Sequence, residues 1–127
     1  MKTKLETIAY ARSGDKGANA NVGVIAYTPQ GFIFLRDILT SEKVEKFFLP
    51  LGVRSTIRYE LPNLWALNFV LQGILKGGGS RSLRIDAQGK ALGQALLQMP
   101  IEIPDALLPS LLPASGETNG AATHPRP

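Results

Sequence analysis

Two glycine-bearing segments carry most of the charged side chains that could support chemistry. The first is Arg12-Ser13-Gly14-Asp15-Lys16-Gly17, which Asn19 and Asn21 follow. Glycine lets the backbone adopt positive φ, so successive N–H groups can converge on an anion, and Arg12 and Lys16 add positive charge. The spacing is not that of a P-loop, because no Gly-Lys-Ser/Thr follows four intervening residues. A tight hairpin loop that needs glycine only for its geometry is the alternative interpretation.

The second segment is Gly77-Gly78-Gly79-Ser80-Arg81-Ser82-Leu83-Arg84. Its three glycines lead into an expected helix, where free N–H groups and the positive end of the helix dipole attract anions. Ser80 or Ser82 could cap that helix, and Arg81 and Arg84 could bind a phosphate or a carboxylate. A flexible connection followed by an ordinary capped helix is the alternative, although capping alone does not require three glycines.

These two segments supply the candidate binding residues. The anion-binding candidates are Arg12, Ser13, Gly14, Lys16, Asn21, Gly77, Gly78, Gly79, Ser80, Arg81 and Arg84.

Two carboxylates are candidates for a catalytic base. Asp15 could orient Lys16 or accept a proton, and Glu60, next to the Pro62-Asn63 turn, could do so if it were buried. A purely structural role in the turn is favoured for Glu60. Asn68 lies within an apolar strand, so we expect it to find a hydrogen-bond partner or to be exposed.

Several classes of site are excluded or not expected. The chain has no cysteine, and its single histidine, His124, lies near the C-terminus. Disulfides, thiolate chemistry and a histidine-based triad or metal site in the domain are therefore excluded. The carboxylates are dispersed, so we expect no metal site, and we expect no cofactor.

Charge and hydropathy indicate the compartment and the partners. The net charge is +4, and the basic residues are scattered rather than clustered. We therefore expect no nucleic-acid partner, while a small anionic ligand or a plain solvated surface fits the scatter. Residues 1–6 do not resemble a signal peptide, and the apolar runs are too short to span a membrane. We expect a soluble cytoplasmic protein.

Hydrophobic periodicity predicts the elements that position these residues. We expect strands over 5–11, 21–28, 53–61, 65–72 and 101–103, with a loop over 12–17. A helix over 41–49 should follow a short helix or extended lead-in from residue 32, and an amphipathic helix should occupy 82–99.

The resulting order, β–β–α–β–β–α–β, determines the fold class. Without its first strand it becomes βαββαβ, the order of a ferredoxin-like α+β fold. We expect a largely antiparallel sheet with helices on one face, which leaves the other face for a partner subunit or a ligand. The domain should span residues 1–103. Residues 104–127 should be a Pro-rich, mostly disordered tail, unless its leucines dock on the domain.

The motifs also resemble a known family. Residues 11–17 and 21–26, together with Glu60-Leu61-Pro62-Asn63-Leu64, residues 66–71 and Gly77–Arg84, resemble blocks of the AtuA-like ferredoxin-fold module. This module occurs at the C-terminus of proteins related to the acyclic terpene utilisation protein AtuA, and also as a separate short protein. The resemblance covers about residues 5–103.

The resemblance implies a ferredoxin-like fold without an iron–sulfur cluster and a link to acyl-CoA or branched-chain catabolism. It implies no particular catalytic residue. Tyr10 and Ala18 stand where many relatives are expected to carry a His and an Asp, so any chemistry of those groups would be lost in this chain.

Three functions follow as hypotheses. The first is an accessory or small-subunit module beside a larger AtuA-type subunit, with both glycine segments facing an anionic acyl-CoA site. The second is a free-standing lyase or hydratase on an acyl-CoA, with Asp15 or Glu60 as the base. The third is a structural homo-oligomer that associates through the open face of the sheet. Ferredoxin-like folds serve many unrelated roles, so the fold does not choose among them.

Overall fold

The computed structural model describes residues 1–17, 19–74 and 88–113, without the side chains of residues 15, 16 and 88–90. Its centre is a four-stranded antiparallel sheet with the order β2-β3-β5-β4. The bounds of these strands are Ala9–Lys16 for β2, Asn19–Ala26 for β3, Ser55–Leu61 for β4 and Ala66–Gln72 for β5. A separate two-stranded sheet pairs β1 (Lys2–Lys4) with β6 (Pro100–Glu102).

Within the described residues, four α-helices and three short 3-10 turns accompany the strands. The α-helices are α1 (Pro29–Ile38), α2 (Ser41–Phe48), α4 (Gln88–Leu96) and α5 (Leu108–Leu111). The 3-10 turns are η1 (Leu5–Thr7), η2 (Leu49–Leu51) and η3 (Pro62–Leu64).

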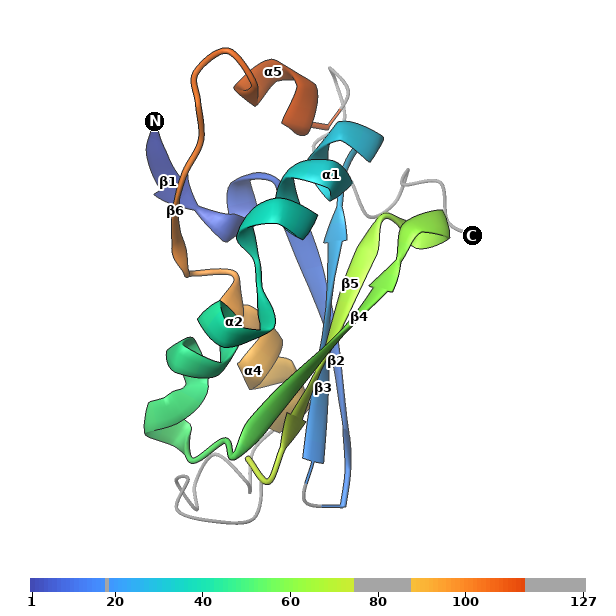
Figure 1. Ribbon diagram of the computed structural model, residues 1–127, viewed down its shortest axis with the longest axis vertical. Coiled ribbons are helices and arrows are strands. Elements are labelled where there is room, and N and C mark those ends of the chain that lie inside the picture. Colours follow the sequence, from blue (N-terminus) through green and yellow to red (C-terminus); the bar gives the residue numbers. More distant parts are fainter. Residues whose placement is uncertain (18, 75–87, 114–127) are drawn as a thin grey trace.

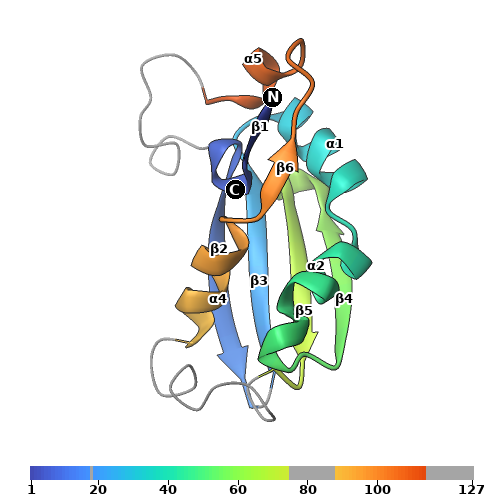
Figure 2. The same ribbon diagram turned by 90° about the vertical axis from the view of Figure 1, so that its left-hand side faces the viewer.

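The helices α1, α2 and α4 lie on one face of the main sheet (Figure 1). Figure 2 looks onto this face and shows α4 in front of β2, with α2 towards the β4 side of the sheet. Alternate residues of the central strands point into this layer, among them the fully buried Val22, Val24, Leu67 and Phe69. A strand sends successive side chains to opposite faces, so Asn21, Gly23, Ile25 and Asn68 belong to the other face.

The structure confirms the predicted fold class, an antiparallel α+β fold with helices on one face of its sheet. The strand that contains Val22 and Val24, β3, lies between β2 and β5 in this sheet. The strand predicted over 101–103 exists as β6, but it pairs with β1 rather than joining the main sheet.

The loop predicted over residues 12–17 is wrong. β2 continues through this polar run to Lys16, which is paired with Asn19 of β3. Only Gly17, with φ of +62°, takes a turn conformation. The polar residues are compatible with a strand because β2 is an edge strand, and the backbone hydrogen bonds to β3 do not depend on side-chain polarity.

Two other boundaries differ from the prediction. Residues 5–7 form the turn η1, so the first strand of the main sheet begins at Ala9 rather than at Leu5. The strand predicted over residues 21–28 ends at Ala26, and Pro29 begins α1. Proline suits the first helical turn because its missing N–H is not needed there, and Thr28 supplies the cap by accepting a hydrogen bond from the N–H of Gly31 at 2.9 Å.

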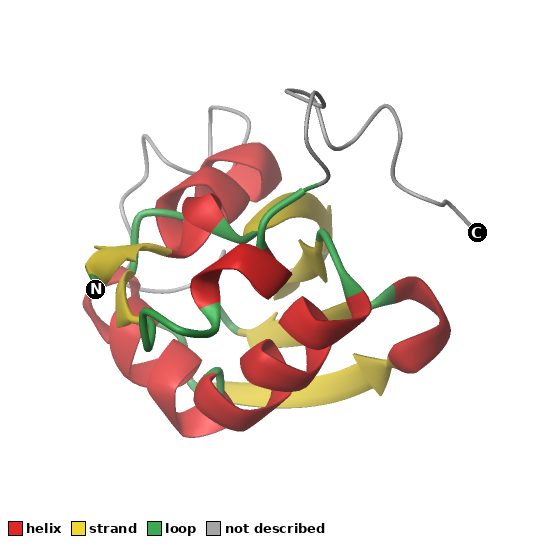
Figure 3. Cartoon of the chain, turned by 90° about the horizontal axis from the view of Figure 1, so that it is seen from above, coloured by secondary structure: helices red, strands yellow, loops and turns green. Residues whose placement is uncertain are grey.

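The beginning of the predicted tail docks on the domain. In α5, Leu111 is 1% exposed and belongs to the main core cluster. The Thr28 hydroxyl donates to the carbonyl of Ser110 at 2.7 Å, which joins α5 to the start of α1. Figure 3 looks down on this end of the domain. Docking of the leucines, the alternative to a disordered tail, therefore holds for residues 108–111, and residues 114–127 lie outside the described part of the chain.

Thr28→Ala should destabilise the protein more than Thr40→Ala does. Each threonine caps a helix, α1 or α2, so each substitution removes a cap that contributes about 1 kcal/mol to the free energy of unfolding. Only Thr28 also holds α5. Chemical denaturation should therefore show the larger loss for Thr28→Ala, and hydrogen exchange at 108–111 should accelerate only in that variant. Equal exchange in both variants would contradict this role of Thr28.

Candidate functional site

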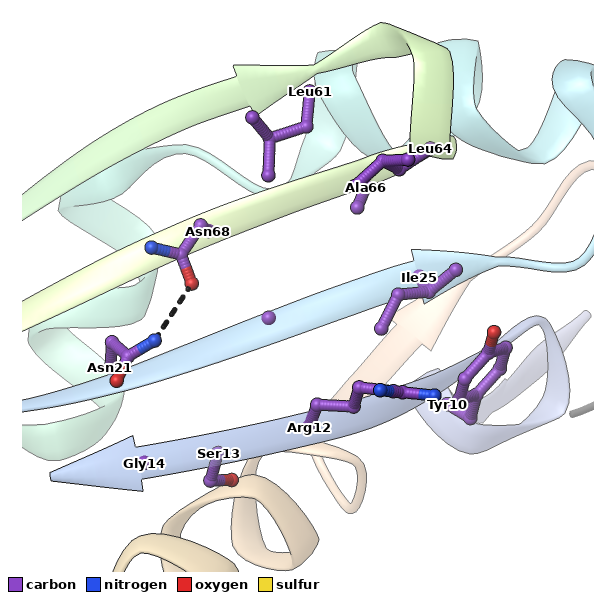
Figure 4. Close-up of a pocket in the computed structure, with 11 residues that line it drawn as sticks. Tyr10, Arg12, Ser13, Gly14, Asn21, Ile25, Leu61, Leu64, Ala66 and Asn68 are labelled. Carbon is purple, nitrogen blue, oxygen red and sulfur yellow. Dashed lines mark hydrogen bonds between the residues drawn. The ribbon is translucent and has the colours of Figure 1, made fainter. Parts of the chain in front are cut away.

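A pocket of about 400 Å³ lies on the face of the main sheet opposite α1, α2 and α4. It crosses β2, β3 and β5 and reaches the end of β4 and the turn η3 (Figure 4). The lining residues are Tyr10, Arg12, Ser13, Gly14, Asn21, Gly23, Ile25, Leu61, Leu64, Ala66 and Asn68. The volume falls in the range of pockets that bind small molecules.

The register of the strands brings the polar residues together. Arg12 is paired with Gly23, and Gly23 is paired with Asn68, so these three positions form one row across β2, β3 and β5. Asn21 lies beside this row, paired with Gly14 on one side and with Val70 on the other. Residues far apart in sequence therefore form one patch because their strands are neighbours.

Arg12 is the cationic group of this pocket. Its side chain is exposed and extends along β2 towards Tyr10 (Figure 4). Among the described side chains, which do not include that of Asp15, no acidic group lies within ion-pair distance of the guanidinium. A guanidinium binds a carboxylate or a phosphate through two parallel hydrogen bonds.

Tyr10 closes one end of the pocket. Its ring contacts that of Tyr27, with 5.6 Å between the ring centroids and 30° between the ring planes. Burial, and to a lesser degree the nearby Tyr10 and Glu6, raise the pKa of Tyr27 above its ordinary value. Tyr27 therefore stays a neutral phenol at physiological pH and supports the Tyr10 ring rather than serving as a base.

Two asparagines provide neutral polar groups on the pocket floor. The side-chain amide of Asn21 donates to the Oδ1 of Asn68 at 3.3 Å (Figure 4). Asn68 thus has a hydrogen-bond partner, which is one of the two outcomes expected for it from the sequence. Gly14 leaves room for this arrangement, because a Cβ at that position would lie 3.1 Å from the Oδ1 of Asn21.

Gly23 makes the hollow in the middle of the pocket. A Cβ there would meet only ordinary contacts, the carbonyl of Arg12 and the Oδ1 of Asn68, both at 3.7 Å. Its φ is not in the left-handed region, so the conformation of the backbone does not require glycine. What glycine provides at this position is space above the sheet.

Apolar residues form the remaining wall. Ile25 and Ala66 are buried and paired with each other across β3 and β5. Leu61, paired with Ala66 on the other side, is 39% exposed, and Leu64 follows in η3. A cation and two amides next to an apolar wall suit a ligand with an anionic head and a hydrocarbon chain.

Ser13 is one of the lining residues, but its side chain lies on the helix-bearing side of the sheet. Its hydroxyl faces α4, since a Cβ at Gly93 would clash with the Oγ of Ser13 (Figure 4). The backbone of Asp15 and Lys16 continues β2, and their side chains are not described. Of the candidates in the first segment, the structure thus brings Arg12, Gly14 and Asn21 into the pocket.

Glu60 lies on the other face of the sheet. It forms an ion pair with Arg58 at 2.9 Å, and Arg58 donates to the carbonyls of Arg36 and Leu39 at the end of α1. Glu60 therefore shares the helix-bearing face and points away from the pocket. Its side chain is 41% exposed, so Glu60 lacks the burial that the sequence-based hypothesis of a catalytic base required.

The candidates in the second segment, Gly77 to Arg84, lie outside the described residues. The chain around that segment is described. Gly73, which follows β5, donates its N–H to the Oδ1 of Asn19 at 2.9 Å, next to the β2–β3 turn. Gly93 of α4 faces Ser13 of β2, and the carbonyl of Leu97, just after α4, accepts a hydrogen bond from the N–H of Glu6, which precedes β2. The helix α4 therefore runs antiparallel to β2, and its first turn lies towards the β2–β3 turn.

Several pocket residues were missed from sequence: Tyr10, Gly23, Ile25, Leu61, Leu64 and Ala66. One signal was available. Gly23 interrupts an otherwise apolar strand, and an isolated glycine in a strand often marks a close approach of another group. The pairing that places Gly23 between Arg12 and Asn68 could not be derived, because register depends on the partner strands.

The described residues contain no group of three or more His, Asp or Glu side chains that could hold a metal ion. No helix among them has the length and apolar character needed to cross a membrane.

Comparison with known families gives a match to the AtuA ferredoxin-like domain over residues 3–102. The match extends from within β1 to the end of β6. The chain belongs to the AtuA ferredoxin-like domain family. No curated protein and no solved structure matches it. The match includes every residue of the pocket and both glycine segments, whereas α5 lies beyond it.

Membership in the AtuA ferredoxin-like domain family confirms the resemblance inferred from the sequence blocks. The fold is ferredoxin-like and cysteine-free, so the AtuA ferredoxin-like domain of this chain cannot hold a cluster through thiolates.

Proposed function

We propose that this AtuA-like domain is an accessory module of a larger AtuA-type subunit in acyl-CoA or branched-chain catabolism. Its role there is to bind an anionic acyl compound on the open face of the sheet. The observation that carries the proposal is the pocket in which Arg12 lies among two amides and an apolar wall. The catabolic setting and the larger subunit come from the family resemblance.

The chemistry of the pocket indicates how such a ligand would lie. Arg12 would bind a carboxylate or a phosphate oxygen, and Asn21 and Asn68 would donate to or accept from the polar atoms next to it. The hydrocarbon part would lie against Ile25 and Leu61. Burial of apolar area contributes about 25 cal/mol per Å², so this wall would favour an acyl chain over a purely polar ligand.

The end of the sheet at which β2 turns into β3 gives further support for an anionic ligand. Lys16 belongs to β2, two residues beyond Gly14, and the described chain enters and leaves the second glycine segment near that end. Arg81 and Arg84 would therefore extend the cationic site in the proposed complex, with Asp15 positioning Lys16. This arrangement is part of the proposal.

The binding test uses Arg12→Gln with Arg36→Gln as its control. Arg36 is also an exposed arginine, but it lies on α1, over the ring of Phe32 at 5.9 Å and behind the sheet. Loss of a hydrogen bond to a charged group costs about 1.5 to 3 kcal/mol, so Arg12→Gln should weaken binding of a branched acyl-CoA about ten- to hundredfold. Arg36→Gln should bind like the unaltered protein.

Isothermal titration with the branched acyl-CoA, free CoA and the corresponding free acid identifies the group that Arg12 contacts. It should be performed on the chain alone and on the chain co-purified with an AtuA-type subunit. Equal binding by Arg12→Gln and the unaltered chain, in both preparations, would refute the site. Failure of a co-expressed AtuA-type subunit to co-purify would refute the accessory role without affecting the site.

A further inference from the structure

The edge strand β4 exposes a short apolar row. Ile57, Tyr59 and Leu61 are 38%, 51% and 39% exposed, and they alternate along one face of the strand. On its inner side β4 pairs with β5, and no strand among the described residues pairs with its outer side. Figure 2 shows β4 at the margin of the sheet. An unprotected edge of this kind is a template for pairing with another strand.

The charges on β4 are self-complementary. Arg58 and Glu60 alternate with the apolar row and point to the helix-bearing face, where they form the 2.9 Å ion pair. In an antiparallel pair of identical strands centred on Tyr59, Arg58 of each copy would face Glu60 of the other. Opposite charges directly across a strand pair are stabilising, and like charges are destabilising.

The same register also brings the apolar row together. Tyr59 would face its own copy, and each Ile57 would face Leu61 of the other chain. Aromatic and branched pairs across strands contribute about 0.2 to 1 kcal/mol each relative to alanine pairs. Every exposed large apolar side chain of β4 would thus meet an apolar partner.

The neighbouring registers are worse for identifiable reasons. Centring the pair on Arg58 places two guanidinium groups opposite each other, and centring it on Glu60 places two carboxylates together. Centring it on Ile57 sets Tyr59 against the polar Ser55. The register centred on Tyr59 satisfies both faces of the sheet.

We propose that a second copy of this chain pairs with β4 in an antiparallel arrangement centred on Tyr59. The dimer is isologous, with its two-fold axis perpendicular to the sheet, so the helices of both copies lie on one face of a continuous eight-stranded sheet. Both pockets then open on the other face, each next to the contact because Leu61 lines the pocket and also lies in the new strand pair. The proposal does not depend on what the pocket binds.

Light scattering on the full chain tests the association. The unaltered protein should have twice the mass of one 13.7 kDa chain. Tyr59→Asp places two carboxylates on the two-fold axis and should halve the mass. Leu107→Asp changes another exposed apolar residue, which precedes α5 and is 42% exposed, and it should leave the dimer intact. A monomeric unaltered chain at every soluble concentration would overturn the proposal, and so would a dimeric Tyr59→Asp.

Engineered cysteines test the register even if Tyr59→Asp fails to fold. The chain has no cysteine of its own, so a single substitution can form a disulfide only between copies. Directly paired residues have Cα atoms about 4.5 to 5.5 Å apart, within disulfide range, so Tyr59→Cys should crosslink with itself. Ile57→Cys and Leu61→Cys should crosslink only when mixed, since each lies four residues from its own copy. Self-crosslinking of Ile57→Cys would overturn the register. Crosslinks formed only with an AtuA-type subunit would show that β4 pairs with that subunit instead.

Discussion

Replacement of Phe69 by alanine should lower the free energy of unfolding by about 3 to 5 kcal/mol, because it removes a large buried ring from the core. Phe69 is fully buried on β5, between Arg58 of β4 and Val22 of β3 in the register of the sheet. It lies beneath the helix layer and next to Asn68 of the pocket. The loss is a large fraction of the stability of a domain of this size.

Val70→Ala is the matched control for this substitution. Val70 is the next residue of the same strand, but it faces the open side and is only partly buried. Its truncation should cost markedly less than that of Phe69, and urea denaturation followed by circular dichroism measures both. If the two variants lost similar amounts of free energy of unfolding, the open face would have to be covered in solution to the same extent as the helix-bearing face.

Gly23→Val should abolish binding in the pocket while leaving the fold intact. The first atom of the new side chain meets only ordinary contacts at 3.7 Å, and valine is favoured over glycine in a strand. The branched side chain would occupy the hollow between Arg12 and Asn68. We expect at least about a tenfold loss of affinity for the branched acyl-CoA, which corresponds to 1.4 kcal/mol.

A graded series of substitutions at Gly23 distinguishes blockage of the pocket from misfolding of the chain. Gly23→Ala adds one methyl group and should weaken binding less than Gly23→Val, and both should unfold at or slightly above the denaturant concentration of the unaltered chain. Val70→Ala, on the same face but not in the pocket lining, should bind normally. Full affinity in Gly23→Val would show that the ligand does not enter this hollow.

From the sequence, the central strand β3 can be predicted better than the edge strand β2. Val22 and Val24 alternate with Asn21 and Gly23, and this period of two is enough to recognise a half-buried strand. The run Arg12–Lys16 has no such pattern. It is a strand because β3 pairs with it, and that is a tertiary effect which local residue preferences do not contain.

The candidate site was predictable only in part for the same reason. Arg12, Gly14 and Asn21 stand out by residue type, and the structure places them in one pocket. Glu60 also stands out by type, yet it lies on the other face, because strand alternation starting from Arg58 directs it towards the helices. Local chemistry therefore identifies candidates, whereas the strand register decides which of them meet.

A residue-resolved NMR titration with the branched acyl-CoA tests the central claim most directly. The account predicts saturable shifts of the amides of Arg12 to Gly14, Asn21 to Ile25 and Ala66 to Asn68, with α1 and α2 unaffected. Shifts confined to the helix-bearing face, or no shift in the chain alone and in its complex with an AtuA-type subunit, would contradict the claim that the open sheet face is the binding site.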